Sequence, residues 1–266
     1  MSRAIGIDVG GTKIAAGLVD SRSGAVLARE EVPTRPERGG EAVLADCAAL
    51  ARTLGGGDVP VGIALCELVD LEGRPDSADT VDWRGLDVPG AIAAPSVVVE
   101  SDVRAAARAE ARFGAGEDRS PFLFVVVGTG ASACLVVDGG PYAGARGRAI
   151  VLGAPPVERV ASGRALARRA GAERAEDVLA DPACTALVDE AASALGGVLG
   201  VLVNALDPRV VVLGGGLGGE PSFRGRVAEA LLSSVAYPPS PPLEVVGSSL
   251  AADGGVVGAA LAAVER

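Results

Sequence analysis

The sequence predicts an α/β protein built from two related lobes. Strand-like apolar runs alternate with segments of helical spacing along the chain, which is typical of layered α/β folds. A strand, a Gly-rich turn and a second strand occur twice, at residues 4–20 and again at 122–137. With 266 residues, 49% of them hydrophobic, the chain can also bury a sizeable core.

The first lobe opens with a hairpin, in which strands at 4–9 and 14–20 flank the turn Gly10-Gly11-Thr12-Lys13. The pattern then predicts a strand at 25–31, a helix at 41–54, strands at 59–65 and 96–100 and a helix at 103–113. Asp102 therefore falls at a junction between strand and helix, where side chains commonly face a ligand site.

The second lobe repeats this opening, with strands at 122–127 and 131–137 around Gly128-Thr129-Gly130. Helices are predicted at 163–170 and 185–206, strands at 210–213 and 243–247, and a closing helix at 255–264. The strand at 210–213 runs into a third Gly-rich turn, Gly214-Gly215-Gly216.

Composition excludes several classes of function. The formal net charge of −10 argues against nucleic acid as a partner, because phosphate backbones are bound by clustered Lys and Arg. Four well-separated cysteines and no histidine argue against a Cys/His zinc site. No N-terminal leader is apparent and no unbroken apolar run reaches the ~20 residues of a membrane span. We therefore expect a cytoplasmic protein with free thiols.

The Gly-rich turns indicate phosphate binding. Glycine lets the backbone approach a phosphate closely, and the N–H groups of such a turn point toward it. Asp8, just before the first turn, could hold Mg²⁺ through water, and Thr12 or Lys13 could contact phosphate. Hairpin turns also use glycine for purely conformational reasons, so the three turns together carry more weight than any one.

The motifs and their order resemble the ROK family of bacterial sugar kinases and sugar-responsive repressors, within the actin-like fold group of hexokinase, Hsp70 and actin. The elements that carry the resemblance are Asp8-Val9-Gly10-Gly11-Thr12-Lys13, Glu100-Ser101-Asp102 with Glu110, Gly128-Thr129-Gly130, Gly144-Ala145-Arg146-Gly147, Asn204-Ala205-Leu206-Asp207-Pro208 and Val212-Leu213-Gly214-Gly215-Gly216. The resemblance covers essentially the whole chain.

The resemblance implies a two-lobed actin-like ATPase fold, with ribonuclease H-like lobes and ATP bound with Mg²⁺ in the cleft between them. It implies an N-terminal lobe at 1–113, joined by the helix at 255–266, and a nucleotide-binding C-terminal lobe at 114–254. Asp8 and its turn would meet metal and phosphates, Gly128-Thr129-Gly130 would form the opposing phosphate turn, and Gly214 to Gly216 would pack against adenosine.

Asp102 matches the family's catalytic base, which takes the proton of the attacking hydroxyl. One well-placed carboxylate is what phosphoryl transfer requires beyond positioning and charge neutralisation. The alternative interpretation of Asp102 is a helix N-cap, a common position for Asp.

The chain departs from the family pattern on the acceptor side. The usual Glu-x-Gly-His appears as Val151-Leu152-Gly153-Ala154, and the Cys-rich zinc stretch that normally follows is missing, so no zinc is expected. Ser101 replaces the Asn before the catalytic Asp, and Cys66-Glu67 replaces a Pro-Gly. The Asn of the other sugar loop falls near Asp79.

These departures favour an acceptor other than an ordinary hexose, such as a modified sugar or a cyclitol, in an ATP-dependent kinase. Glu67, Asp79 and Asp82 are the acidic residues expected nearest the acceptor, although each could equally be a solvated loop charge. A pseudokinase is the alternative, since acceptor ligands are lost. A repressor is disfavoured because the first strand begins at about Ala4, ahead of which we expect no DNA-binding domain. A homodimer remains an open alternative to a monomer.

Overall fold

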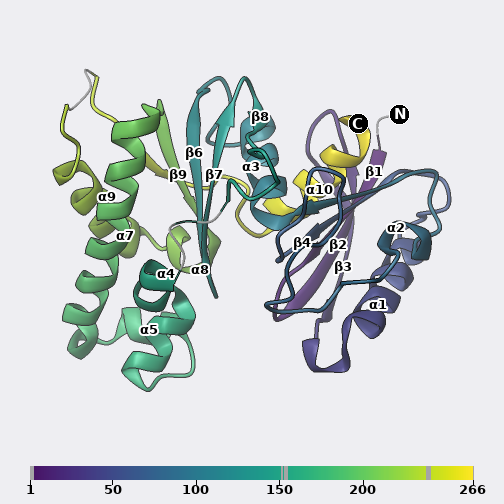
Figure 1. Cartoon of the computed structure of the whole chain (residues 1–266), viewed down its shortest axis with the longest axis horizontal. Helices are drawn as coiled ribbons and strands as arrows, with labels where there is room; N and C mark the ends of the chain where they lie inside the picture. Colours follow the sequence, from purple (N-terminus) through teal and green to yellow (C-terminus); the bar gives the residue numbers. More distant parts are fainter. Residues whose placement is uncertain (1–2, 151, 153–154, 238–240, 266) are drawn as a thin grey trace. The chain divides into compact units, whose positions relative to one another are not determined.

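The computed structural model describes residues 3–150, 152, 155–237 and 241–265 (Figure 1). The chain divides into two compact units. Unit 1 comprises Met1–Phe113, Pro141–Ala149 and Ala252–Arg266, and unit 2 comprises Gly114–Gly140 and Ile150–Ala251. The first division falls after Phe113, where the sequence placed it. Residues 141–149 were assigned to the second lobe, but they pack with unit 1.

Unit 1 contains a five-stranded sheet in the order β3-β2-β1-β4-β5. Its strands are β1 (Arg3–Val9), β2 (Lys13–Asp20), β3 (Val26–Pro33), β4 (Val61–Leu65) and β5 (Val97–Ser101). β1, β2 and β3 pair antiparallel, whereas β4 and β5 run parallel to β1. The carboxyl ends of β1, β4 and β5 therefore meet at one edge of the sheet.

Helices cover both faces of this sheet (Figure 1). They are α1 (Gly40–Thr53), the short α2 (Val88–Ala91), α3 (Asp102–Phe113) and α10 (Gly254–Glu265). α1 packs on one face, where Val43 and Leu44 join Ile7 and Ile63 in the core. α10 lies directly on the other face at Gly6, where a Cβ would sit 1.8 Å from the carbonyl oxygen of Val256. Glycine on the strands is what permits this close approach.

Unit 2 repeats the strand order in its own sheet, β10-β9-β6-β7-β8. Its strands are β6 (Phe122–Val127), β7 (Ala131–Val137), β8 (Gly140–Pro141), β9 (Val210–Gly214) and β10 (Glu244–Gly247). β6 and β7 form the antiparallel hairpin, and β9 and β10 add in parallel, as β4 and β5 do in unit 1. The repeat predicted from the two hairpins is confirmed by this shared order.

Four of the unit 2 helices were not predicted from the sequence, namely those at residues 155–161, 175–180, 215–219 and 221–233. The helices of unit 2 are α4 (Pro155–Ala161), α5 (Gly163–Ala170), α6 (Ala175–Ala180), α7 (Thr185–Leu206), α8 (Gly215–Gly219) and α9 (Pro221–Ser233). No element had been assigned to α9. Only Phe223, Val227 and Leu231 of α9 are buried, so its apolar stripe is one residue wide per turn.

One helix of the described residues, Pro182–Leu206, is long and apolar enough by length and composition to cross a membrane. No unbroken apolar run of ~20 residues was expected from the sequence, and Asp189 and Glu190 do interrupt the apolar run of this segment. Val188, Leu195 and Leu199 of this helix are buried in the core of unit 2, and α9 runs alongside it (Figure 1). These contacts are those of a core helix.

Candidate functional site

The parallel strands of unit 1 bring together the polar residues that follow them. Asp8 lies near the end of β1, Cys66 and Glu67 come directly after β4, and Asp102 directly follows β5. In the sheet register Asp8 is level with Ala64, and Ala64 with Glu100. These chemically active side chains therefore share the carboxyl edge of one sheet, the usual place for a site in such folds.

Asp102 is the first residue of α3, and its Oδ1 accepts the backbone N–H of Val103 at 2.6 Å. Burial raises the pKa of this carboxyl to about 7, and the negative charge of Asp8 adds to the increase. A carboxylate whose pKa lies near neutrality is suited to accept a proton. The bond to Val103 lies within the first turn of α3 and uses one oxygen of the carboxylate. Asp102 can therefore stabilise the helix N-terminus and also act as a base.

Asp8 is half-buried beside the first Gly-rich turn. Burial raises its pKa to about 6, although the charges of Lys13 and Arg29 oppose the increase. Lys13 itself is exposed, and its ammonium bonds Glu31 of β3 at 2.9 Å. The Lys13 ammonium is therefore paired with a neighbouring strand, and a bound phosphate would have to compete with Glu31 for this ammonium.

The turn itself is held by a residue that the sequence analysis did not select. The N–H of Gly10 bonds the carbonyl of Lys13 at 3.0 Å, which closes the turn. Thr34, fully buried after β3, donates its hydroxyl to the carbonyl of Gly10 at 2.7 Å and its N–H to the carbonyl of Thr12 at 3.0 Å. The Gly10–Lys13 turn is thus fastened to the third strand.

The carboxylate of Glu67 is bonded to a loop of its own unit. This carboxylate is buried and accepts four hydrogen bonds from one loop: from the Ser77 hydroxyl and from the N–H groups of Asp79 (2.9 Å), Thr80 (2.6 Å) and Val81 (2.9 Å). Both oxygens are used in this way. Glu67 therefore organises the loop at 77–81, and its direct contact with the acceptor stays a prediction.

Thr80 is the residue of this loop that lies beside the first Gly-rich turn. A Cβ on Gly11 would lie 3.3 Å from Cγ2 of Thr80, and the Thr80 side chain lies close enough to the Cys66 thiol to lower its pKa. Burial, followed by the charge of Asp102, raises the pKa of Cys66 to about 12, so the group remains a neutral thiol. Asp79 is exposed. Thr80 was not predicted because an irregular loop has no hydrophobic periodicity to show which of two neighbouring residues faces the site.

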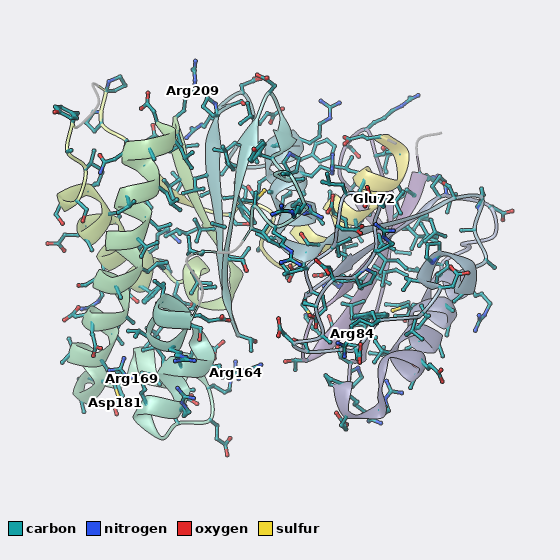
Figure 2. All side chains as sticks on the ribbon, in the orientation of Figure 1. Glu72, Arg84, Arg164, Arg169, Asp181 and Arg209 are labelled. Atoms are coloured by element: carbon teal, nitrogen blue, oxygen red, sulfur yellow. The ribbon has the colours of Figure 1, made fainter. Side chains whose placement is uncertain are left out.

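The other predicted acceptor residues differ in their surroundings. Ser101 is fully buried, and its hydroxyl has no hydrogen-bond partner within the described part of the chain. Asp82 is exposed and forms a bidentate pair, at 2.8 Å for both bonds, with Arg84, which is labelled in Figure 2. Of the segment at 151–154, only Leu152 lies within the described residues, and it is buried in the core of unit 2.

Unit 2 carries the second Gly-rich turn between β6 and β7. The N–H of Gly128 bonds the carbonyl of Gly130 at 2.9 Å, and the carbonyl of Gly128 accepts the N–H of Gly163, the first residue of α5, at 2.7 Å. Glu158 of α4 also approaches this turn, since its Oε1 would lie 2.5 Å from a Cβ on Gly130. Thr129 is exposed at the tip.

The third turn connects β9 to α8. Gly215 has a φ of +81°, and a Cβ there would lie 2.5 Å from the carbonyl oxygen of Val127, so only glycine fits. Oε1 of Glu176 lies 3.9 Å from the Cβ position of Gly216. A shallow pocket of about 230 Å³ opens next to it, lined by Glu176, Leu179, Ala180, Glu220 and Ser222.

No group of three or more His, Cys, Asp or Glu side chains comes close enough to hold a metal within the described residues. Mg²⁺ nonetheless fits Asp8, because this ion usually binds one or two carboxylates and completes its shell with water and substrate phosphates. A half-buried carboxyl that forms no ion pair with any described residue is a suitable donor.

The two sheets of matching order, each with a Gly-rich hairpin turn, define the class of the protein as an actin-like ATPase fold. The chain belongs to the ROK family, whose model matches residues 4–266. A glucokinase of Streptomyces coelicolor is 32% identical over 83% of this chain and 84% of its own length. An N-acetylmannosamine kinase of Haemophilus influenzae is 27% identical over 97% of this chain and 94% of its own.

Solved structures agree with this assignment. The crystal structure of a ROK family glucokinase from Streptomyces griseus, in complex with glucose and AMPPNP, matches with a TM-score of 0.87 and 28% identity. The match covers 99% of this chain and all of that one.

Proposed function

We propose that this protein is an ATP-dependent carbohydrate kinase that phosphorylates a hydroxyl of a modified sugar or a cyclitol, with Asp102 as general base. The observation that carries the proposal is the placement of Asp8 and Asp102 at one edge of the unit 1 sheet, with the pKa of Asp102 raised to about 7. Its sequence relatives named as glucokinases and an N-acetylmannosamine kinase support the reaction class.

In the proposed reaction the acceptor oxygen attacks the γ-phosphorus of ATP, and the bond from that phosphorus to the bridging oxygen breaks to release ADP. The hydroxyl proton passes to the carboxylate of Asp102, which a pKa near 7 makes an effective acceptor at neutral pH. Asp8 would hold Mg²⁺, which supplies charge neutralisation on the phosphates when bound.

The nucleotide contacts of the proposal come from three turns. Gly10 to Lys13 in unit 1, with Thr12 exposed at its tip, and Gly128 to Gly130 in unit 2 would bind phosphate through backbone N–H groups. Gly214 to Gly216 and the pocket beside Glu176 would take the nucleoside, since Gly216 leaves its backbone open to a flat ring.

The acceptor side supports a substrate other than glucose. The thiol of Cys66 lies near both Asp102 and Asp8, and the side chain of Thr80 lies near that thiol, a pair with few hydrogen-bonding groups. Ser101 adds one buried hydroxyl that is free to bond a ligand or water. A site with few hydrogen-bonding groups orients a ring with many hydroxyls, such as glucose, poorly in the transition state.

A coupled ADP-release assay over glucose, mannose, N-acetylated hexosamines, aminosugars and cyclitols tests the proposal, with Asp102→Asn as the inactive control. We expect turnover on a modified ring and weak activity on glucose. Efficient phosphorylation of glucose at micromolar KM would overturn the acceptor assignment. ATP binding without turnover on any acceptor would favour the pseudokinase.

Three further expectations belong to the proposal. Activity should survive removal of zinc, which metal analysis of active enzyme checks, because the chain has no histidine and no family zinc stretch. We propose a cytoplasmic enzyme whose partner is its small acceptor, with no nucleic acid or membrane involved. Whether it forms a homodimer is decided by sedimentation of the purified protein.

A further inference from the structure

Arg104, two residues into α3 from Asp102, is buried with 3% of its surface exposed and uses its whole guanidinium group. Nε donates to Oε1 of Glu100 at 2.5 Å, Nη1 to the carbonyl of Gly147 at 2.5 Å, and Nη2 to the carbonyl of Val69 at 2.8 Å. A single side chain thereby joins the end of β5 to two other segments of unit 1.

The ion pair alone does not account for this arrangement. Glu100 is itself 4% exposed, and its Oε1 also accepts the N–H of Ser101 at 2.9 Å. If the ion pair with Glu100 were the only interaction, a lysine at position 104 could supply it. The two bonds to backbone carbonyls need the flat, forked guanidinium, which presents several donors in a fixed geometry.

The segments that Arg104 joins are in direct contact. Gly147 has a φ of +73°, and a Cβ there would lie 2.2 Å from the carbonyl oxygen of Val69. Arg148 adds an exposed bond to Asp76 at 2.5 Å. The segment at 144–148 therefore packs against the loop that follows β4. Arg104 bonds one backbone carbonyl in each of them.

This loop leads to the acceptor side of the site. Val69 lies two residues after Glu67, whose carboxylate holds the far end of the same loop at 77–81. Arg104 fixes the start of the loop and Glu67 its end. Thr80, whose N–H bonds Glu67 and whose side chain lies near Cys66, belongs to the loop that this pair of buried charged groups holds.

We propose that Arg104 is a positioning residue that holds the acceptor loop, residues 68–81, and the segment at 144–148 in register with the helix that begins at Asp102. The proposal that this geometry serves the acceptor rests on the proposed kinase function. A purely structural Arg104 would lower stability without a selective effect on one substrate.

Arg104→Lys tests the proposal, because lysine keeps the charge beside Glu100 and loses the fork. Arg112→Lys is the matched control, since Arg112 is exposed on the same helix. Hydrogen exchange of the free protein should accelerate about tenfold or more in peptides at 68–76 and 143–149, and remain unchanged in β1 and β2. The acceptor KM should rise about tenfold or more while the KM for ATP stays within about twofold.

Unchanged exchange in both segments, or equal changes in the two KM values, would reject the positioning role. If Arg104→Lys does not fold, the double variant Arg104→Met with Glu100→Gln removes the buried charge along with its partner. Failure of both to fold makes Arg104 a folding residue and also rejects the proposal. Exchange needs no substrate, so it tests Arg104 even if the wild-type enzyme proves inactive on every sugar.

Discussion

Asp8 lies directly against Gly255, the second residue of α10: a Cβ at Gly255 would sit 2.3 Å from Oδ2 of Asp8. The last helix therefore has no side chain at the position that contacts Asp8, the proposed metal-binding carboxylate.

Gly255→Ala should therefore reduce activity. Alanine in a helix normally stabilises a protein by up to ~1 kcal/mol relative to glycine, but here its methyl group must displace the carboxylate of Asp8. We expect a loss of turnover of about tenfold or more and a raised Mg²⁺ requirement, measured in ADP-release titrations with Mg²⁺. Gly225→Ala on α9, where no atom lies within 4 Å of the Cβ position, is the control and should be active and slightly more stable. Equal behaviour of the two variants would show that the contact with Asp8 has no functional weight.

Glu67→Gln should weaken acceptor use selectively. Glutamine offers one acceptor oxygen where the loop at 77–81 supplies four donors, so two or more bonds are lost and an amide N–H meets another donor. Lost buried hydrogen bonds typically cost ~1–3 kcal/mol, or about 5- to 160-fold in acceptor kcat/KM. Steady-state kinetics in both substrates check this. The exposed Glu72, labelled in Figure 2, supplies the control Glu72→Gln, and a comparable loss there would rule out a specific role for Glu67.

Asp102→Asn should lower kcat by about 10²- to 10⁴-fold with ATP binding retained, because the proton acceptor is removed. In the wild type, the rate should fall about tenfold per pH unit below an apparent pKa near 7, since the reaction needs the ionised carboxylate. Asp8, with a pKa of about 6, titrates in the same range, so the limb reports the pair. A pH profile that keeps this limb in the Asn variant would assign it to another group.

The same variant should stabilise the free protein. The folded state holds the Asp102 proton more tightly than the unfolded state does, because the pKa rises from 3.8 to about 7. Between these values the folded state binds more protons, so stability falls as pH rises through this window and stays lower above it. Asparagine does not titrate, and we expect a gain of ~1–2 kcal/mol at pH 8 that disappears near pH 4. Thermal unfolding at both pH values measures it, and a variant less stable than wild type at pH 8 would contradict it.

Much of the fold could be predicted from the sequence because hydrophobic periodicity and turn residues, which act over a few positions, define most of its strands and helices. The two hairpins at 4–20 and 122–137, the helix that follows Asp102 and the closing helix each carry their own periodicity or turn residues. The order of the Gly-rich turns likewise led to the ROK family, which residues 4–266 match. The helix at 221–233 was missed because its apolar stripe is narrow.

What the sequence determined by itself was which residue types stand at the ends of which strands, since strand and turn signals act over a few residues. Only the tertiary structure decided how those residues are used. The carboxylate of Glu67 holds a loop, the side chain of Thr80 lies near Cys66, and Arg104 joins three segments. These roles depend on contacts between residues up to 43 positions apart, and no local pattern encodes the partner of a buried charge.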